Sequence, residues 1–170
     1  MMKKNKIIFI VIIFTLIITG CGHKKPSKDV IESKDQLNNK SGSMSCTRQV
    51  NAPSGVKPTL SYDITYKNNE ILVLHSIEGI ESSTKENLDE YEEAYKKINN
   101  NYKGLKYYDS KVTRTDNSVT RDTTINYEKI NINKLLEIEG EEDNIIENGK
   151  ASLKLWLKFA KKFGTTCHED

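Results

Sequence analysis

The sequence predicts an α+β two-layer sandwich, in which an antiparallel sheet has helices packed on one face. Alternating apolar residues over 59–66 and 118–127 are typical of half-buried strands. A stripe of apolar residues at spacings of three and four, from Leu88 to Tyr102, is typical of an amphipathic helix. Because strands joined by tight turns pair antiparallel, helices placed between them are expected to cover one face of the sheet.

The first strands are predicted over 59–66 and 71–77, joined by the turn Lys67-Asn68-Asn69-Glu70. Asn suits this turn because it tolerates the left-handed conformation that hairpins need. An earlier strand is expected over 46–51, before Pro53. We see no internal repeat.

The helix that follows is expected to start at a capping box formed by Ser83 and Glu86, and to end by Gly104. Two more strands are predicted over 105–115 and 118–127. Asn131 is placed to cap a short helix that runs through Ile138.

An acidic loop is expected over 139–144, and a last helix over 152–163 with Gly164 as its end. Its apolar side is predicted to carry Leu153, Trp156, Leu157, Ala160 and Phe163.

The N-terminus has the pattern of a bacterial export signal. Residues 1–20 place three lysines before a twelve-residue apolar run, which is too short to span a membrane as a helix. Ile18-Thr19-Gly20-Cys21 resembles the lipobox of bacterial lipoproteins, which implies cleavage before Cys21 and a diacylglyceryl lipid on its thiol. Palmitate-type acyl chains would then hold the protein to the outer, extracytoplasmic face of the cell membrane. The alternatives are a plain signal peptide or a short membrane anchor.

The remaining chain divides into two parts. Residues 21–45 are polar and lack a helical or alternating period, so we expect a flexible tether, with a helix over 29–37 as the alternative. Residues 46–170 are expected to form a single domain. Without the signal, the 26 basic residues fall to 23 against 24 acidic ones, which disfavours nucleic-acid binding by bulk charge.

Cys46 and Cys167 remain once Cys21 is lipidated, and an even pair in an exported protein usually forms a disulfide. The α-carbons must then lie about 4.4–6.8 Å apart. The alternative is two free thiols.

No catalytic motif, metal-ligand spacing or cofactor signature is present in the sequence. His75 in a strand is expected to be structural, and His168 with Glu169 and Asp170 is a weak metal candidate. The acidic cluster over 137–147 is a second candidate, because hard cations prefer carboxylate oxygens. Its acids are Glu137, Glu139, Glu141, Glu142, Asp143 and Glu147.

A family resemblance comes from the C-terminal half. Residues 122–134 form a strand that ends in Tyr-Glu-Lys and runs into a short helix, and the Trp156-containing helix ends at Gly164. Together with the lipobox, this resembles the YehR-like family of small bacterial lipoproteins over 59–164. The resemblance implies a two-layer sandwich and carries no functional residues, because the family's function is unknown.

These observations favour a non-enzymatic, lipid-anchored binding or accessory protein of the cell envelope, with an unknown protein or small-molecule ligand and no cofactor. The alternative is a small envelope enzyme or metal-dependent binder that uses the acidic loop over 137–147. A concave pocket with convergent polar groups would favour the binder. A buried carboxylate or histidine with a shifted pKa in a cleft would favour the enzyme.

Overall fold

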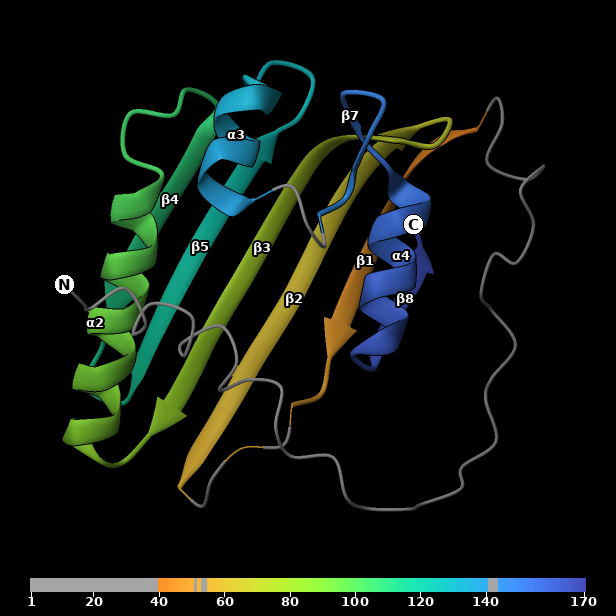
Figure 1. Ribbon diagram of the computed structural model, residues 1–170. Helices are drawn as coiled ribbons and strands as arrows, with labels where there is room; N and C mark the ends of the chain where they lie inside the picture. Colours follow the sequence, from red (N-terminus) through yellow and green to blue (C-terminus); the bar gives the residue numbers. More distant parts are fainter. Residues whose placement is uncertain (1–39, 51, 53–54, 141–143) are drawn as a thin grey trace, which may run out of the picture.

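The computed structural model describes residues 40–50, 52, 55–140 and 144–170 (Figure 1). Six strands form one antiparallel sheet in the order β4-β5-β3-β2-β1-β8. They are β1 (Ser41–Arg48), β2 (Val56–Lys67), β3 (Glu70–Ser82), β4 (Tyr108–Arg114), β5 (Ser118–Asn126) and β8 (Thr165–Glu169). A separate two-stranded hairpin consists of β6 (Ile146–Glu147) and β7 (Lys150–Ala151).

The helices in the described part are α2 (Lys85–Asn101), α3 (Ile132–Glu139) and α4 (Leu153–Lys162). All three lie on the same face of the sheet, with α2 over the β4–β5 edge and α4 over the β1–β8 edge (Figure 1). This arrangement confirms the predicted α+β sandwich.

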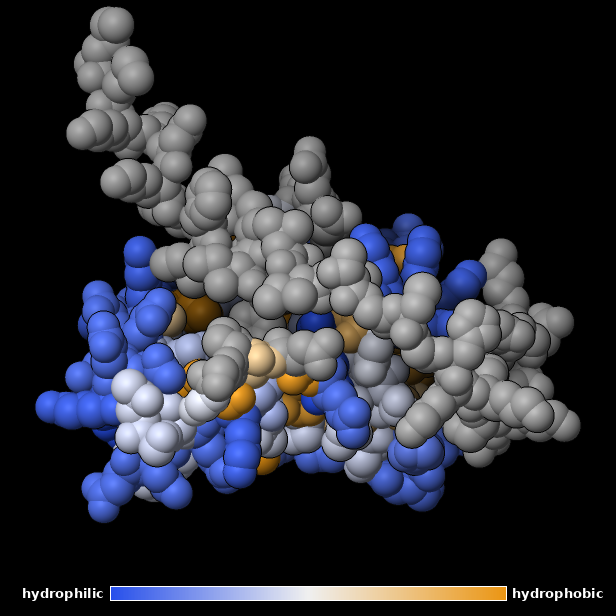
Figure 2. All heavy atoms as spheres, turned by 90° about the horizontal axis from the view of Figure 1, so that it is seen from below, coloured by the Kyte–Doolittle hydropathy of each residue, from blue (hydrophilic) through white to orange (hydrophobic). Residues whose placement is uncertain are grey.

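The core consists of three clusters, each built around one helix. The largest lies beneath α4, where Trp156 and Ala160 contact Met44 of β1 and Ile64 of β2. The others pack Leu88 of α2 and Leu135 of α3 against the sheet. In the view from below Figure 1, hydrophilic side chains lie on both sides of a short hydrophobic strip (Figure 2).

Polar side chains line the opposite face of the sheet. In β1 these are serines and a threonine, because the alternation that turns Met44 and Cys46 inward turns their neighbours outward. The outward residues of β1 are Ser41, Ser43, Ser45 and Thr47, which pair with Lys67, Thr65, Asp63 and Ser61 of β2.

The predicted tether over 21–45 is wrong in its last five residues, because β1 already begins at Ser41. Met44 is 2% exposed, and Gly42 lies where a side chain would meet the Tyr66 hydroxyl at 3.0 Å. Small residues are thus needed for packing here, although in the sequence they look like a linker. Residues 21–39 lie outside the described residues.

The start of α2 also differs from the prediction. Its N-cap is Thr84, whose side chain forms no capping hydrogen bond, so the Ser83–Glu86 capping box is wrong. Instead the Ser82 hydroxyl accepts hydrogen bonds from the backbone N–H of Thr84 at 3.1 Å and from Asn87 Nδ2 at 3.2 Å. The long strand β3 therefore continues directly into the cap of the helix.

The other two helices begin as predicted. The Asn131 side chain accepts a hydrogen bond from the backbone N–H of Lys134. In the same way, the Ser152 side chain accepts a hydrogen bond from the backbone N–H of Leu155. Gly164 has a φ of 76°, which ends α4 at the predicted position. The chain then forms β8, an edge strand that the sequence analysis did not predict.

Candidate functional site

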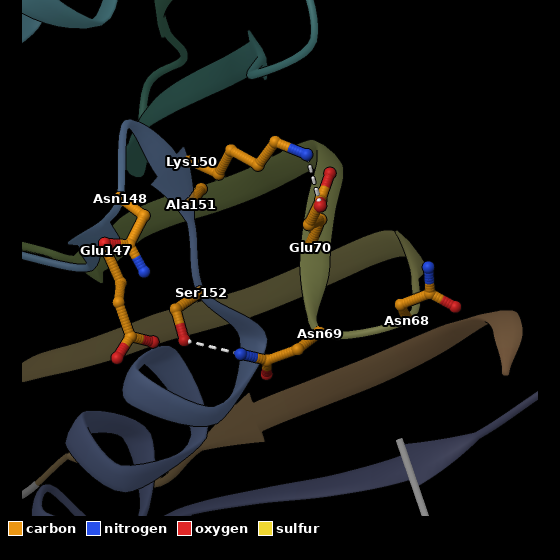
Figure 3. A pocket seen from close by; sticks show the side chains of 8 residues that line it. All are labelled: Asn68, Asn69, Glu70, Glu147, Asn148, Lys150, Ala151 and Ser152. Atoms are coloured by element: carbon orange, nitrogen blue, oxygen red, sulfur yellow. Dashed lines mark hydrogen bonds and ion pairs between the residues drawn. The ribbon is translucent and has the colours of Figure 1, made fainter. Parts of the chain in front are cut away.

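A polar pocket of about 370 Å³ opens at one end of the sheet (Figure 3). The β2–β3 turn, the β6–β7 hairpin and the start of α4 meet there. The pocket is lined by Asn68, Asn69, Glu70, Glu147, Asn148, Lys150, Ala151 and Ser152. Hydrogen-bonding groups from three separate segments therefore converge on one concave surface.

Asn69 holds the β2–β3 turn against the start of α4. Its Nδ2 donates to Ser152 Oγ at 3.0 Å, and its Oδ1 accepts from the backbone N–H of Lys154 at 2.9 Å. Its backbone oxygen accepts from the Leu153 N–H at 2.8 Å. The helix start would otherwise leave such N–H groups without partners, so these bonds fix the base of the pocket.

Two tight turns shape the rest of the pocket. Asn68 has a φ of 56°, which confirms the left-handed turn predicted from Asn68-Asn69. In the β6–β7 hairpin, Asn148 and Gly149 have φ values of 54° and 76°, the pattern of a two-residue hairpin turn. An ion pair between Lys150 Nζ and Glu70 Oε1, at 2.5 Å, joins this hairpin to β3.

The side chains of Glu147 and Asn148 lie on one side of the pocket, and the Lys150–Glu70 pair lies across from them (Figure 3). Within the described residues, neither Glu147 nor Asn148 has a side-chain hydrogen bond. The Glu147 carboxylate is thus available to accept hydrogen bonds from a ligand, and the Asn148 carboxamide is available both to accept and to donate them. The described residues that line the pocket include no aromatic ring.

The structure brings Cys46 and Cys167 together on β1 and β8. They are directly opposite in the antiparallel register, with sulfur atoms 2.15 Å apart. Their α-carbons are 4.0 Å apart, slightly closer than the expected range of about 4.4–6.8 Å. This bonding distance is consistent with the predicted disulfide. His168 is exposed and pairs with Ser45, so alternation directs its side chain away from the Cys167 side of β8.

The acidic cluster over 137–147 is divided between elements. Glu137 and Glu139 lie on α3 and Glu147 lies on β6, whereas residues 141–143 are outside the described residues. In the described part of the chain, no group of three or more His, Cys, Asp or Glu side chains is placed to hold a metal ion. Cys21 and the signal over 1–20 also lie outside the described residues.

His75 lies on the polar face of the sheet between two carboxylates. Its Nε2 is 2.9 Å from Asp122 Oδ1 on β5, and its Nδ1 is 3.4 Å from Asp63 Oδ2 on β2. The Ser45 hydroxyl donates to Asp63 at 3.1 Å, not to His75. This order differs from a serine–histidine–aspartate relay, in which the imidazole accepts the hydroxyl proton.

The ion pairs of His75 predict a pH-dependent contribution to stability. Burial lowers the pKa of His75, but the hydrogen bonds to Asp122 and Asp63 outweigh it and raise the pKa above the ordinary value. The stabilisation is therefore complete below the ordinary value of about 6.5 and is lost as the pH rises through the raised pKa.

We expect the free-energy difference between the wild type and His75→Gln to be larger at about pH 6 than at about pH 8. It should stay below about 1 kcal/mol because both carboxylates are exposed. Urea unfolding at both pH values measures it. Asp122→Asn should lower the His75 pKa in an NMR titration, and an unchanged pKa would contradict the assignment.

Within the described residues, no helix is long and apolar enough to cross a membrane. The fold and pocket together define a small α+β domain with a concave polar pocket at one end of its sheet.

Neither a protein-family model nor a curated protein sequence matches the chain. Similar solved structures include the NMR structure of the Escherichia coli YehR protein. It is 21% identical, with a TM-score of 0.52, and the match covers 75% of this chain and 92% of that one. The NMR structure of a protein from Streptococcus pneumoniae TIGR4 is 16% identical, with a TM-score of 0.48, over 91% and 98% of the two chains. The YehR likeness shows a YehR-like fold.

Proposed function

We propose that the protein is a non-enzymatic binding protein of the cell envelope, a member of the YehR-like lipoproteins, anchored by a lipid on Cys21. The observation that carries the binding role is the pocket between the β2–β3 turn and the β6–β7 hairpin. A concave site with a few convergent polar groups is the usual form of a small-molecule site. The lipobox-like sequence before Cys21 supports the anchor.

The chemistry of the pocket favours a small neutral ligand with hydroxyl and amide groups. Glu147 and Asn148 supply an acceptor and a carboxamide, whereas Lys150 is already paired with Glu70. A strongly anionic ligand would meet the carboxylates of Glu70 and Glu147 and would have to compete with Glu70 for the Lys150 ammonium group. Suitable probes are N-acetylglucosamine, which carries hydroxyls and an amide, and diglycine, which carries an amide between charged ends.

Titration of the isotope-labelled protein with each probe, followed by NMR, tests this function. We expect amide shifts confined to residues 68–70 and 147–152. Glu147→Gln should weaken binding about two- to tenfold, the size of one hydrogen bond. Asn148→Gly should also weaken it, and glycine keeps the positive φ of the turn.

Glu93→Gln is the matched control, because Glu93 is an exposed acid on α2 and takes no part in the pocket. It should leave the affinity unchanged. Shifts that fall outside the pocket, or an affinity unaffected by Glu147→Gln, would overturn the assignment of this site.

A further inference from the structure

Strand β4 is the outermost strand of the six-stranded sheet, and its outer edge borders no other described strand (Figure 1). Two hydrogen bonds show which of its backbone groups point outward. The Asn126 N–H of β5 donates to the Tyr107 oxygen at 3.0 Å. At the other end of the hairpin, the Thr115 N–H donates to the Ser118 oxygen at 2.9 Å. Because bonding alternates along an antiparallel strand, the odd-numbered residues of β4 bond to β5 and the even-numbered ones point their backbone groups outward.

Helix α2 leaves this outer edge uncovered. In its core cluster, α2 packs with Ile80 of β3, Val119 of β5 and Val112 of β4, so the helix is centred over β5. A further strand could therefore lie beside β4 without meeting the helix. Unpaired backbone groups on an edge strand are a template for pairing with another strand.

On the polar face of the sheet, the side chains of β4 carry opposite charges two positions apart. Asp109 and Lys111 are both exposed. Within the described residues, neither side chain forms an ion pair or a hydrogen bond. Asp122, which lies opposite Lys111 on β5, is bonded to His75 at 2.9 Å. A lysine in an edge strand usually discourages pairing with another chain, unless an acid faces it there.

A second copy of β4 can pair with the first symmetrically, with a two-fold axis at one residue. An axis at Asp109 or at Lys111 would place like charges directly opposite each other, which is unfavourable. An axis at Tyr108 or Val112 would pair neither charge and would leave part of each strand without a partner. An axis at Ser110 places Asp109 opposite the partner's Lys111, and Lys111 opposite the partner's Asp109.

The register centred at Ser110 also matches the backbone groups that point outward. Ser110 lies opposite the partner's Ser110, and Tyr108 lies opposite the partner's Val112. Each of these pairs can exchange both backbone hydrogen bonds. On the helix side, Tyr108 and the partner's Val112 form an apolar cross-strand pair. Tyr107, which is 47% exposed, lies opposite the partner's Thr113 in the same register.

The opposite edge of the sheet suits such pairing less well. Strand β8 has only five residues, and the Glu169 carboxylate already accepts from Lys40 and from the Tyr66 hydroxyl. Pairing of β4 with the partner's β8 would give an open chain of copies, whereas pairing of β4 with the partner's β4 closes at two.

We propose that the chain forms a symmetric dimer, in which β4 pairs with the partner's β4 in the antiparallel register centred at Ser110. The two-fold axis is perpendicular to the sheet, so the helices of both copies lie on the same face. The β2–β3 turn of the pocket is separated from β4 by β5, and the pocket therefore stays open in the dimer. The dimer requires neither the lipid anchor nor the ligand of the proposed function, so its test is independent of both.

Two cysteine variants of the full chain test the register. Asp109→Cys and Lys111→Cys are expressed together with different tags and treated with a mild oxidant. We expect a disulfide between the two variants, because α-carbons at such opposite positions are about 4.5 Å apart. Either variant alone should give no link, since diagonal positions are about 7–8 Å apart.

The wild type is the control for links through the native cysteines. Absence of the mixed link, or equal linking in either variant alone, would overturn the proposal.

Charge reversal tests the same contact without added cysteines. Asp109→Lys places like charges opposite each other on both sides of the axis and should weaken the dimer about tenfold. Asp109→Lys with Lys111→Asp exchanges the two charges, so it should restore the affinity to within about twofold of the wild type. Sedimentation equilibrium of the full protein, in detergent matched to the solvent density, measures the three affinities.

Glu81→Lys is the matched control, because Glu81 is exposed on the same face but lies on β3, inside the sheet. It makes the same change in net charge and should leave the dimer unchanged. All variants should keep the wild-type melting temperature. Equal weakening by Glu81→Lys, no restoration in the exchanged variant, or assemblies larger than two chains would contradict the proposal. A wild type that stays monomeric in this measurement would contradict it as well.

Discussion

Replacing both Cys46 and Cys167 with alanine is expected to lower the free energy of unfolding by up to about 4–5 kcal/mol. The two residues are 121 positions apart, and closing a loop of this length removes much of the entropy of the unfolded chain. For a domain of this size the melting temperature should fall by about 10–20 °C. Thermal unfolding of the double variant, with and without reductant, measures the effect.

Thr47→Ala with Thr166→Ala is the matched control, because these threonines face each other one position along the same pair of strands. Both are exposed, so their replacement should cost less than about 1 kcal/mol. Reductant should lower the melting temperature of the wild type and leave that of the cysteine variant unchanged. Equal stability of the wild type and the cysteine variant without reductant would contradict a bond between the two positions.

Arg121→Met is expected to destabilise the protein by about 2–4 kcal/mol, although methionine is a good core residue. The Arg121 side chain on β5 is only 8% exposed and connects α2 with two other strands. Its Nε donates to Asn99 Oδ1 at 2.8 Å, its Nη1 to Glu78 Oε2 at 3.2 Å, and its Nη2 to the Tyr108 hydroxyl. Replacing Arg121 takes the charged partner from Glu78 and a donor from the Tyr108 hydroxyl, whereas Asn99 keeps its hydrogen bond from Ser110.

Arg114→Met provides the comparison. Arg114 on β4 also pairs with α2, through Asp89 and Glu92, but its side chain is 25% exposed. Water can replace Arg114 as the hydrogen-bond partner of the two carboxylates. The free energy of unfolding should therefore fall by less than about 1 kcal/mol. Urea unfolding gives both values. Adding Glu78→Leu to Arg121→Met should recover part of the loss, since no unpaired charge is then left. Equal costs for the two arginine variants would refute a buried role for Arg121.

Periodicity in the sequence predicted most of the architecture. The alternation from Thr59 to Tyr66 and the stripe from Leu88 to Tyr102 each correspond to an observed element, β2 and α2, because each buries one face. Asn131 and Gly164 marked the ends of helices correctly, since these residue types satisfy specific backbone needs.

The edge of the sheet was harder to predict. Strand β8 contains Thr-Thr-Cys-His-Glu, and Cys167 is its one apolar residue packed against the core, so no hydrophobic alternation marks it as a strand. Strand β1 has the same difficulty, because serines fill its outward positions. The cysteine pair was the one signal in the sequence that placed these two segments side by side. It predicted that Cys46 and Cys167 are in contact, but it did not predict that the segment around Cys167 is a strand or how the two segments are aligned.

The pocket could be predicted only in pieces. The Asn68-Asn69 turn was expected, and the Asn148-Gly149 pair is a strong hairpin signal that could have located the β6–β7 turn. Their meeting at the start of α4 depends on tertiary packing through Asn69, about eighty positions from Ser152 in the chain. The hydrogen-bond partners of His75 could not be predicted from the sequence for the same reason, because Asp63 and Asp122 belong to different strands.

The central claim is that the domain works at a membrane surface to which Cys21 anchors it. Mass spectrometry of the N-terminal peptide of the full protein, purified from the membrane fraction of bacteria that express it, tests this claim most directly. We predict a mature chain that begins at Cys21 and has the added mass of a diacylglyceryl group, and Cys21→Ser should leave the protein unprocessed or released. An unacylated N-terminus at another position in the wild type would contradict the account.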